Sequence, residues 1–404
     1  MKKILIFLVT VAVLLSSAVP VSAATVSMEY DATDLDIPLE ENVQASAGIG
    51  ERLELNVKSA ILMEFNTGKV LYEANSDEKL APASITKIMT LILVMEAIDS
   101  GKLKLEDQIT ASEHAASLGG SQIWLEPNEV MTVDELLRAT VIASANDATV
   151  ALAEAVAGTE ESFVAMMNEK AKELGMNNTN FINSYGLDAD GHLTTAHDVA
   201  LMSAELIKHD LIKNYTTVWS DSLRGGESEL VNTNKLIRYY DGAFGLKTGT
   251  TSKAGSCLAA TAQRDGMTLI AVVLGAPTSN DRFGGAKKLL DYGFANYSYT
   301  SIKADTKDFT NIPVKKGTVR EIVPTVKEEF SALLKKGEES GITQKFELET
   351  ELEAPVKAGD TVGYVHLYLG EEEIGVIPIV AENGSEKLTF WVCLMRLFQA
   401  LFTL

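Results

Sequence analysis

Apolar residues follow three different patterns along the chain, and the changes between them predict the order of the domains. Between residues 53 and 302, β-prone runs at both ends enclose a series of helical patterns. Between 303 and 385, apolar and polar residues alternate in runs separated by turn residues, which is typical of a half-buried antiparallel sheet. Residues 386–404 return to a helical spacing. We therefore expect an α/β (α+β) domain, a small all-β domain and a C-terminal helix.

The first domain is predicted to begin with a β-hairpin. Residues 59–65 and 70–73 are β-prone runs joined by a turn signal at 66–68. A helix from about Ile85 to Ile98 is apolar on nearly every face, so we expect it to be the buried central helix of the domain. The remaining patterns are helices at 133–143, 147–157, 161–174, 196–208 and 285–296, and strands at 243–247, 256–262 and 268–274.

The N-terminal segment has the composition of a secretory signal peptide. Lys2 and Lys3 precede an apolar run, and small residues follow it up to Ala24. The apolar run is too short to span a bilayer comfortably, which disfavours a retained anchor. Residues 25–52 are interpreted as a solvated acidic spacer, because Thr25 to Glu51 contains seven acidic residues and no basic one.

The C-terminal residues 388–404 are mostly large and apolar. Thr389, Arg396, Gln399 and Thr403 interrupt them at spacings that place these four on one helical stripe. An amphipathic helix lying on a membrane surface fits this pattern better than a spanning helix, given the short length and the in-line arginine. A helix docked on the core of the protein itself is the alternative.

Composition removes several classes of function. A chain of 404 residues with 46% hydrophobic content can bury two cores. The net charge of -21 argues against binding to nucleic acid, whose phosphates require a basic surface. Cys257 and Cys393 are far apart in sequence and receive no catalytic role. The five histidines are dispersed, His192 and His197 are interpreted as structural, and we expect no metal and no cofactor.

Ser84 and Lys87 form the first of three short motifs that carry chemistry. Their spacing places the lysine beside the hydroxyl on one face of the helix. A serine hydroxyl is a poor nucleophile unless a neighbouring base takes its proton. Lys87 can be that base if burial and a second cation, Lys247, lower its pKa. Taken alone, such a tetrad is common by chance and favours a simple helix cap with a surface lysine.

The second motif, Ser144-Ala-Asn146, lies between two helical patterns, where a loop is expected to expose both side chains. A hydroxyl there could relay a proton between Lys87 and a leaving amine. The amide of Asn146 could hold a substrate carbonyl and form a hydrogen bond with Lys87. By itself the tripeptide is also compatible with a cap for the next helix.

The third motif, Lys247-Thr-Gly249, ends a β-prone run. Gly249 permits close approach of a substrate backbone to the strand edge, to which an extended peptide can add. Lys247 and the hydroxyls of Thr248 and Thr250 are suited to a terminal carboxylate. The backbone N–H groups of Ser84 and Thr250 would form an oxyanion hole.

The order of these motifs resembles the Ser-x-x-Lys, Ser-x-Asn and Lys-Thr-Gly set of the penicillin-recognising serine enzymes. Residues 82–90, 120–125, 142–148 and 191–198 look like the low-molecular-mass penicillin-binding proteins that act as D-Ala-D-Ala carboxypeptidases. The resemblance covers roughly residues 54–385. It implies a penicillin-binding/β-lactamase-like transpeptidase domain with an antiparallel sheet and a central buried helix, then an all-β domain and an amphipathic helix.

The resemblance implies that the enzyme removes the terminal D-alanine from peptidoglycan pentapeptides through an acyl-enzyme on Ser84, with β-lactams as inhibitors. It also implies attachment by 388–404 to the outer face of the cytoplasmic membrane. The corresponding residues are Ser84, Lys87 and Ser144 for catalysis, and Asn146, Lys247, Thr248, Gly249, Thr250 and Arg282 for substrate binding. Thr250 stands where some relatives carry histidine, which leaves the backbone donor intact. For Arg282, a surface arginine is the alternative to a carboxylate ligand.

Other readings of the motifs stay open at this point. A β-lactamase would share them but needs a positioned base for fast deacylation, for which Glu160 and Glu161 are near in sequence only. A non-catalytic penicillin-binding or wall-peptide recognition module is the alternative from another class, and it has no need for the intact Ser84 and Lys87. A transpeptidase or an endopeptidase would use the same residues.

Overall fold

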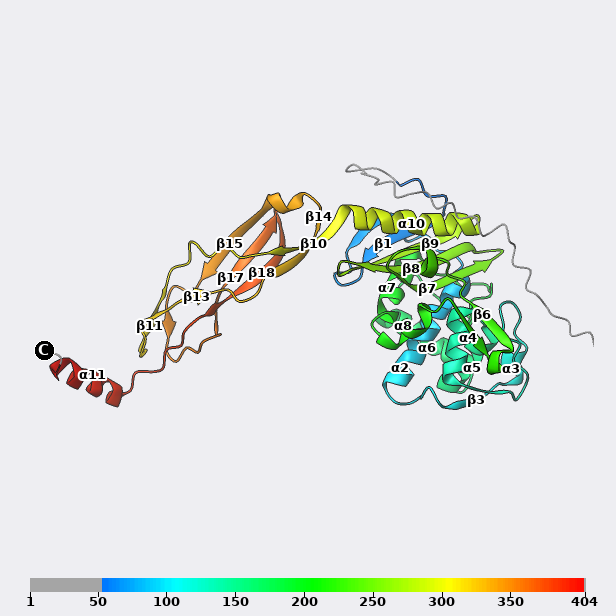
Figure 1. The fold of residues 1–404 in the computed structure, drawn as a ribbon, viewed down its shortest axis with the longest axis horizontal. Coiled ribbons are helices and arrows are strands. Elements are labelled where there is room, and N and C mark those ends of the chain that lie inside the picture. Colours follow the sequence, from blue (N-terminus) through cyan, green and yellow to red (C-terminus); the bar gives the residue numbers. More distant parts are fainter. Residues whose placement is uncertain (1–52, 403–404) are drawn as a thin grey trace, which may run out of the picture. The chain divides into compact units, whose positions relative to one another are not determined.

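A five-stranded antiparallel sheet organises the first part of the protein (Figure 1). The computed structural model describes residues 53–402, so the predicted signal peptide and acidic spacer lie outside the described residues. The strands, in their order across the sheet, are β2 (Val70–Ala74), β1 (Ser59–Glu64), β9 (Met267–Ala276), β8 (Gly255–Arg264) and β7 (Ala243–Thr251). The predicted β-hairpin of β1 and β2 is confirmed, and β7 lies at one edge of the sheet.

The sheet is covered on both faces, which explains why its central strands are almost entirely apolar. Along β9, Ile270 and Val272 pack into the core beneath the helical layer, whereas Leu269 and Val273 pack into a second core on the other face. Alternate residues of a strand point to opposite faces, so both sets must be apolar when both faces are covered. The second core is closed by α10 (Ser279–Asn296), which lies across the sheet (Figure 1).

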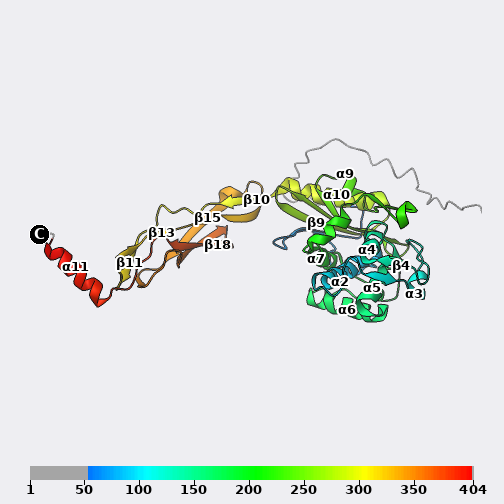
Figure 2. The ribbon, with the colours of Figure 1, turned by 60° about the horizontal axis from the view of Figure 1, so that its bottom comes forward.

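The helical layer is built around α2 (Lys87–Asp99), whose first nine residues are all buried. This helix contacts α5, α6, α7 and β7, and Figure 2 shows it running among the first two of these. The predicted central buried helix is therefore confirmed, and it ends where Gly101 adopts a φ of 72°. The other long helices of the layer are α4 (Val133–Ile142), α5 (Asn146–Ala157), α6 (Glu160–Glu173) and α7 (Ala196–Leu206).

Short elements connect these helices. They are η2 (Ala83–Thr86), β3 (Gln108–Thr110), α3 (Glu113–Ala116), β4 (Val130–Thr132), η3 (Asp210–Ile212), α8 (Lys213–Thr216), β5 (Ser220–Leu223), η4 (Arg224–Gly226), β6 (Ser228–Val231) and α9 (Leu236–Tyr239). The α4 helix begins with a capping box, in which Thr132 and Glu135 exchange hydrogen bonds with each other's backbone N–H groups.

Two elements are longer than their sequence patterns predicted. The α10 helix begins at Ser279 rather than near Gly285, because Thr278 caps it and packing on the sheet outweighs the low helix propensity of its glycines. Strand β7 continues to Thr251, four residues beyond the predicted strand end at Lys247. As a consequence, the third motif lies inside a strand.

The all-β prediction for the second part of the chain is confirmed. A four-stranded sheet has the order β13 (Pro324–Thr325), β18 (Glu372–Ala381), β17 (Thr361–Leu369) and β15 (Ile342–Leu348). The remaining elements are β10 (Tyr297–Ile302) paired with β14 (Phe330–Lys335), β11 (Ile312–Lys315) between β12 (Glu321–Ile322) and β16 (Leu352–Glu353), and the short η5 (Glu338–Gly341). Val362, Leu367 and Ile379 are among the residues of its core.

The C-terminal segment forms the helix α11 (Phe390–Phe402). Phe390, Trp391, Leu397 and Phe398 are each at least half exposed. Within residues 53–402, no helix is long and apolar enough to cross a membrane.

Candidate active site

Ser84 lies on the tight turn η2, directly before α2, and this turn is closely packed on two sides. Ala83 has a φ of 48°, which a residue with a side chain rarely adopts. A Cβ on Gly186 would lie 2.0 Å from the carbonyl oxygen of Ala83, and one on Gly249 would lie 2.9 Å from the nitrogen of Ser84. The nucleophile turn is therefore held between the loop around Gly186 and strand β7, at positions where only glycine fits.

Lys87 is completely buried beside Ser84 and is held by three oxygen atoms. Its Nζ lies 3.0 Å from Ser84 Oγ, 2.6 Å from Asn146 Oδ1 and 2.7 Å from the carbonyl oxygen of Tyr185. Burial and the nearby charge of Lys247 lower the pKa of Lys87 well below its ordinary value. The structure thus places Lys87 beside Ser84, as the sequence predicted, in surroundings that disfavour the charged form of the amine.

The second motif is buried, so the expectation that a loop would expose it is wrong. Ser144 is 4% exposed and Asn146 is 3% exposed, and the segment from Gly119 to Leu125 is hydrogen-bonded to Asn146 and Asp147. The Asn146 side chain donates to the carbonyl of Gly119 (2.7 Å), and its backbone N–H donates to that of Ser121 (2.7 Å). Among the residues that the structure describes, the Ser144 hydroxyl forms no hydrogen bond to Lys87.

Asp147 supports this arrangement and was missed by reasoning from the sequence. Its buried carboxylate accepts hydrogen bonds from the backbone N–H groups of Ile123, Leu125 and Ala148. It also partly opposes the lowering of the pKa of Lys87. An acidic residue in the first turn of a helix, next to Asn146, was the available signal, but its partners Ile123 and Leu125 lie more than 20 residues away.

The third motif lies in the middle of the edge strand β7. Lys247 is 1% exposed, and its Nζ donates to the carbonyl of Thr248 (3.2 Å). Burial, followed by the charge of Arg282, lowers the pKa of Lys247 to about 7. The Thr248 hydroxyl donates to that of Thr233 (2.7 Å). Because β7 has a neighbouring strand on one side only, no other strand of this sheet pairs with its outer edge.

Arg282 reaches this strand from α10, so the alternative of a surface arginine is wrong. It is 9% exposed, and its Nη1 donates to the carbonyl of Gly249 (3.2 Å) and to the hydroxyl of Thr250 (2.8 Å). The structure therefore brings Arg282 to Gly249 and Thr250, and Gly249 in turn lies against the backbone of Ser84. Thr250 itself is exposed and is oriented by Arg282.

Glu160, which we considered as a deacylating base, holds a loop instead. One carboxylate oxygen accepts hydrogen bonds from the backbone N–H and the hydroxyl of Ser184 (2.9 and 2.8 Å), and the other pairs with His114 (2.7 Å). This loop continues into Tyr185 and Gly186, which contact Lys87 and Ala83. Glu160 thus supports the site through the backbone.

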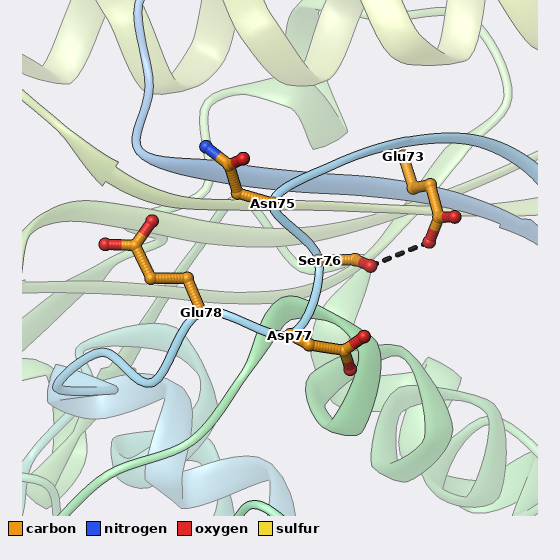
Figure 3. Close-up of a pocket in the computed structure, with 5 residues that line it drawn as sticks. All are labelled: Glu73, Asn75, Ser76, Asp77 and Glu78. Atoms are coloured by element: carbon orange, nitrogen blue, oxygen red, sulfur yellow. Dashed lines mark hydrogen bonds between the residues drawn. The ribbon is translucent and has the colours of Figure 1, made fainter.

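A separate surface pocket is lined by acidic and polar side chains of residues 73–78 (Figure 3). Within it, the Ser76 hydroxyl donates to Glu73 (2.7 Å). None of the residues predicted for the site lines this pocket. Within residues 53–402, no group of His, Cys, Asp and Glu side chains is arranged to hold a metal ion.

The fold and the site define a serine enzyme of the penicillin-binding class. A family model described as D-alanyl-D-alanine carboxypeptidase, peptidase family S11, matches residues 42–278. A second model, the C-terminal domain of penicillin-binding protein 5, matches residues 297–387. The chain therefore belongs to the D-alanyl-D-alanine carboxypeptidase family.

Individual relatives agree with this assignment. D-alanyl-D-alanine carboxypeptidase DacF of Bacillus subtilis (strain 168) is 45% identical over 343 residues, covering 84% of this chain and 88% of the relative. Penicillin-binding protein 5 from Haemophilus influenzae superposes with a TM-score of 0.69 at 31% identity, covering 83% of this chain and 99% of that one. Penicillin-binding protein D2 from Listeria monocytogenes, in its ampicillin-bound form, superposes with a TM-score of 0.56 at 34% identity. The match covers 60% of this chain and 100% of that one.

We predict that Gly186→Ala will disable the site, whereas Gly191→Ala will not. Both glycines have positive φ, at 97° and 80°, so alanine strains the backbone at either position by about 1 kcal/mol. Only at Gly186 does the new Cβ also collide with Ala83. Overpacking against Ala83 adds a strain of about 1–3 kcal/mol to the turn that carries Ser84. A barrier raised by about 1.4 kcal/mol slows a reaction tenfold, so the rate of D-alanine release should fall about tenfold or more.

The measurements are thermal unfolding and the rate of D-alanine release from a D-Ala-D-Ala peptide. The Gly191→Ala protein should lose little rate, because the nearest atom to its new Cβ is 3.8 Å away. Equal losses of rate in the two variants would contradict the close packing of Gly186 on the nucleophile turn.

Proposed function

We propose that the protein removes the terminal D-alanine from peptidoglycan pentapeptides through an acyl-enzyme on Ser84. The observation that carries this proposal is the buried Lys87 amine, which lies 3.0 Å from Ser84 Oγ and has a lowered pKa. A nucleophile and its base within hydrogen-bonding distance are the requirement for acyl transfer. The family supplies the substrate, a peptide ending in D-Ala-D-Ala.

The surroundings of Lys87 favour the direction of proton transfer. A neutral amine has two N–H donors and one lone pair. Asn146 Oδ1 and the Tyr185 carbonyl can only accept hydrogen bonds, so they take the two donors. The lone pair is then left for the proton of the Ser84 hydroxyl. Lys87 acts as the base in this mechanism because its two other contacts fix its orientation.

Substrate binds as an added strand along the open edge of β7. Its terminal carboxylate contacts Lys247 and the hydroxyls of Thr248 and Thr250. The hydroxyl of Thr250 is held by Arg282. The scissile carbonyl oxygen enters the oxyanion hole formed by the N–H groups of Ser84 and Thr250. The second N–H of the Asn146 amide, which donates only once here, is left for another substrate carbonyl.

The reaction proceeds in two balanced steps. Ser84 Oγ bonds to the penultimate carbonyl carbon, the C–N bond to the last D-alanine breaks, and the serine proton passes through Lys87 and Ser144 to the leaving amine. Water then bonds to the ester carbon, the bond to Ser84 breaks, and one proton of that water passes to Ser84 Oγ, which leaves the shortened peptide with a new carboxyl group. A β-lactam enters the same first step, but its leaving nitrogen stays tethered, so it acts as an inhibitor.

We further propose that this enzyme works outside the cytoplasm, on the outer face of the membrane. The charged, apolar and small-residue pattern of residues 1–24 supports export. The exposed apolar side chains of α11 support attachment to the membrane surface. Such a position would keep the enzyme near wall peptides close to the membrane.

We predict that Ser84→Ala will abolish both D-alanine release and covalent labelling, because the variant lacks the nucleophile. Ser76→Ala serves as the control, since it removes a hydroxyl that donates to Glu73 instead. Mass spectrometry after exposure to a labelled β-lactam and to a D-Ala-D-Ala pentapeptide locates the adduct. Labelling at any residue other than Ser84, or equal release from Ser84→Ala and the unmutated enzyme, would refute the mechanism.

We predict that KM for a D-Ala-D-Ala peptide rises as the pH increases through about 7. The pKa of Lys247 is lowered to about 7, so above this pH it loses the proton that pairs with the substrate carboxylate. Above this pH, the fraction of Lys247 that is charged falls about tenfold for each pH unit. The rise in KM can therefore be at most about tenfold per pH unit.

Arg282→Gln should move this rise in KM to higher pH. The charge of Arg282 helps to lower the pKa of Lys247, so its removal raises that pKa. Arg264→Gln is the control. This arginine is the last residue of β8, donates a hydrogen bond to the carbonyl of Asp241, and is not one of the predicted site residues. The pH dependence of KM in the three proteins gives the answer, and an unchanged midpoint in Arg282→Gln would contradict the electrostatic coupling.

We predict that Phe398→Glu weakens the binding of the mature chain to vesicles of phosphatidylglycerol and phosphatidylethanolamine. Loss of a buried phenylalanine side chain costs about 1.5–3 kcal/mol, or roughly tenfold to hundredfold in affinity. Gln399→Glu, which adds the same charge on the polar stripe, should bind nearly as well as the unmutated chain. Equal loss in both variants, measured by vesicle sedimentation, would argue against an interface helix.

A further inference from the structure

His192 is a buried residue that the mechanism above does not use. It is 2% exposed, and its ring lies edge-on to that of Phe181. Burial lowers the pKa of His192 to about 4, so the ring is neutral near pH 7. The backbone N–H of Ile182 donates to Nδ1 over 2.9 Å. Because Nδ1 accepts a hydrogen bond, the single ring proton must be on Nε2.

The Nε2 atom is directed at Thr86, and the bonds of Thr86 fix the direction of the contact. Thr86 Oγ1 donates its only proton to the carbonyl of Ala83 over 2.8 Å. The same oxygen lies 2.8 Å from His192 Nε2, so it accepts the Nε2 proton. The result is a chain of hydrogen bonds that all point the same way, from His192 through Thr86 to Ala83.

The end of this chain lies on the peptide unit that contains the backbone N–H of Ser84. A peptide unit is planar, so its carbonyl and N–H point in opposite directions and move together. The bond that holds the Ala83 carbonyl therefore also orients the Ser84 N–H. Ala83 needs such support, because its φ of 48° is unfavourable for an L-residue. Accepting a hydrogen bond at the carbonyl also strengthens the N–H as a donor.

We propose that Thr86 and His192 are positioning residues for acylation, which orient and polarise the Ala83–Ser84 peptide unit as one half of the oxyanion hole. Neither side chain touches the substrate. Negative charge that develops on the substrate carbonyl oxygen lies at the end of the aligned chain and is stabilised by it. The inference rests on the proposed acyl-enzyme at Ser84 and adds two residues that act through the backbone.

Thr86→Val is the primary test, with Thr86→Ser as its matched control. Valine fills the same buried space without the hydroxyl, whereas serine keeps the donor and the acceptor. Loss of an oxyanion donor costs 10²–10³ in rate, so weakening one donor should slow acylation by a penicillin about tenfold to hundredfold. The dissociation constant of the initial complex should stay unchanged, and Thr86→Ser should acylate within about threefold of normal.

Infrared spectroscopy provides a readout that a purely structural role would not change. In the acyl-enzyme formed with a penicillin carrying a ¹³C-labelled β-lactam carbonyl, hydrogen bonding in the oxyanion hole lowers the stretching frequency of the ester carbonyl. We expect this band to move to higher frequency in Thr86→Val and to stay in place in Thr86→Ser. Normal acylation by Thr86→Val, or slower acylation without a shift of the band, would overturn the inference.

A second pair of variants tests the other end of the chain and decides the matter if Thr86→Val does not fold. His192→Gln retains a donor toward Thr86, whereas His192→Leu removes it, so only the leucine variant should acylate slowly with a shifted band. Equal behaviour of the two would overturn the role of His192. If the unmutated protein forms no adduct at Ser84, the proposed function itself fails, which is a different result from an adduct whose band is insensitive to Thr86.

Discussion

The burial of an amine beside a hydroxyl is the constraint on which the rest of this structure depends. Lys87 lies wholly inside the protein, where a charged ammonium is poorly solvated, so its neutral form is favoured. A neutral amine is useful only if its lone pair faces the nucleophile. Two carbonyl oxygens, from Asn146 and Tyr185, impose this orientation, and each is supplied by a different part of the fold.

Much of the surrounding architecture can be understood as support for those two oxygens. The segment from Gly119 to Leu125 is tied to Asn146 and Asp147 at the start of α5. The loop that contains Tyr185 is tied to Glu160 at the start of α6. The supporting side chains stand at helix N-termini. Asp147 and Glu160 accept hydrogen bonds from backbone N–H groups, and Asn146 donates one to a backbone carbonyl. The catalytic geometry thus depends on helices that carry no catalytic residue of their own, apart from Asn146.

The features predictable from the sequence were those encoded locally. An all-round apolar pattern predicted the buried helix α2, and alternation predicted the all-β domain. The motifs predicted residues that lie beside one another in the structure, such as Ser84, Lys87 and Asn146. Contacts between distant segments were not predictable in this way. The contact of Lys87 with the Tyr185 carbonyl involves a backbone atom, which residue type does not reveal. Backbone partners of Asn146 and Asp147 lie in a segment more than 20 residues earlier, and the approach of Arg282 to Thr250 depends on where α10 begins. His192 was interpreted from the sequence as structural, and its partner Thr86 is 106 residues away.

The position of the third motif on an edge strand has a consequence for self-association. An unpaired strand edge can recruit another protein chain as readily as a substrate, which makes it a site of aggregation unless something interrupts it. In β7 the interruption is a lysine that turns inward and a glycine with no side chain to pack. The residues proposed to admit a short peptide are therefore also poorly suited to a long, regular ladder, which disfavours pairing of this edge with another chain.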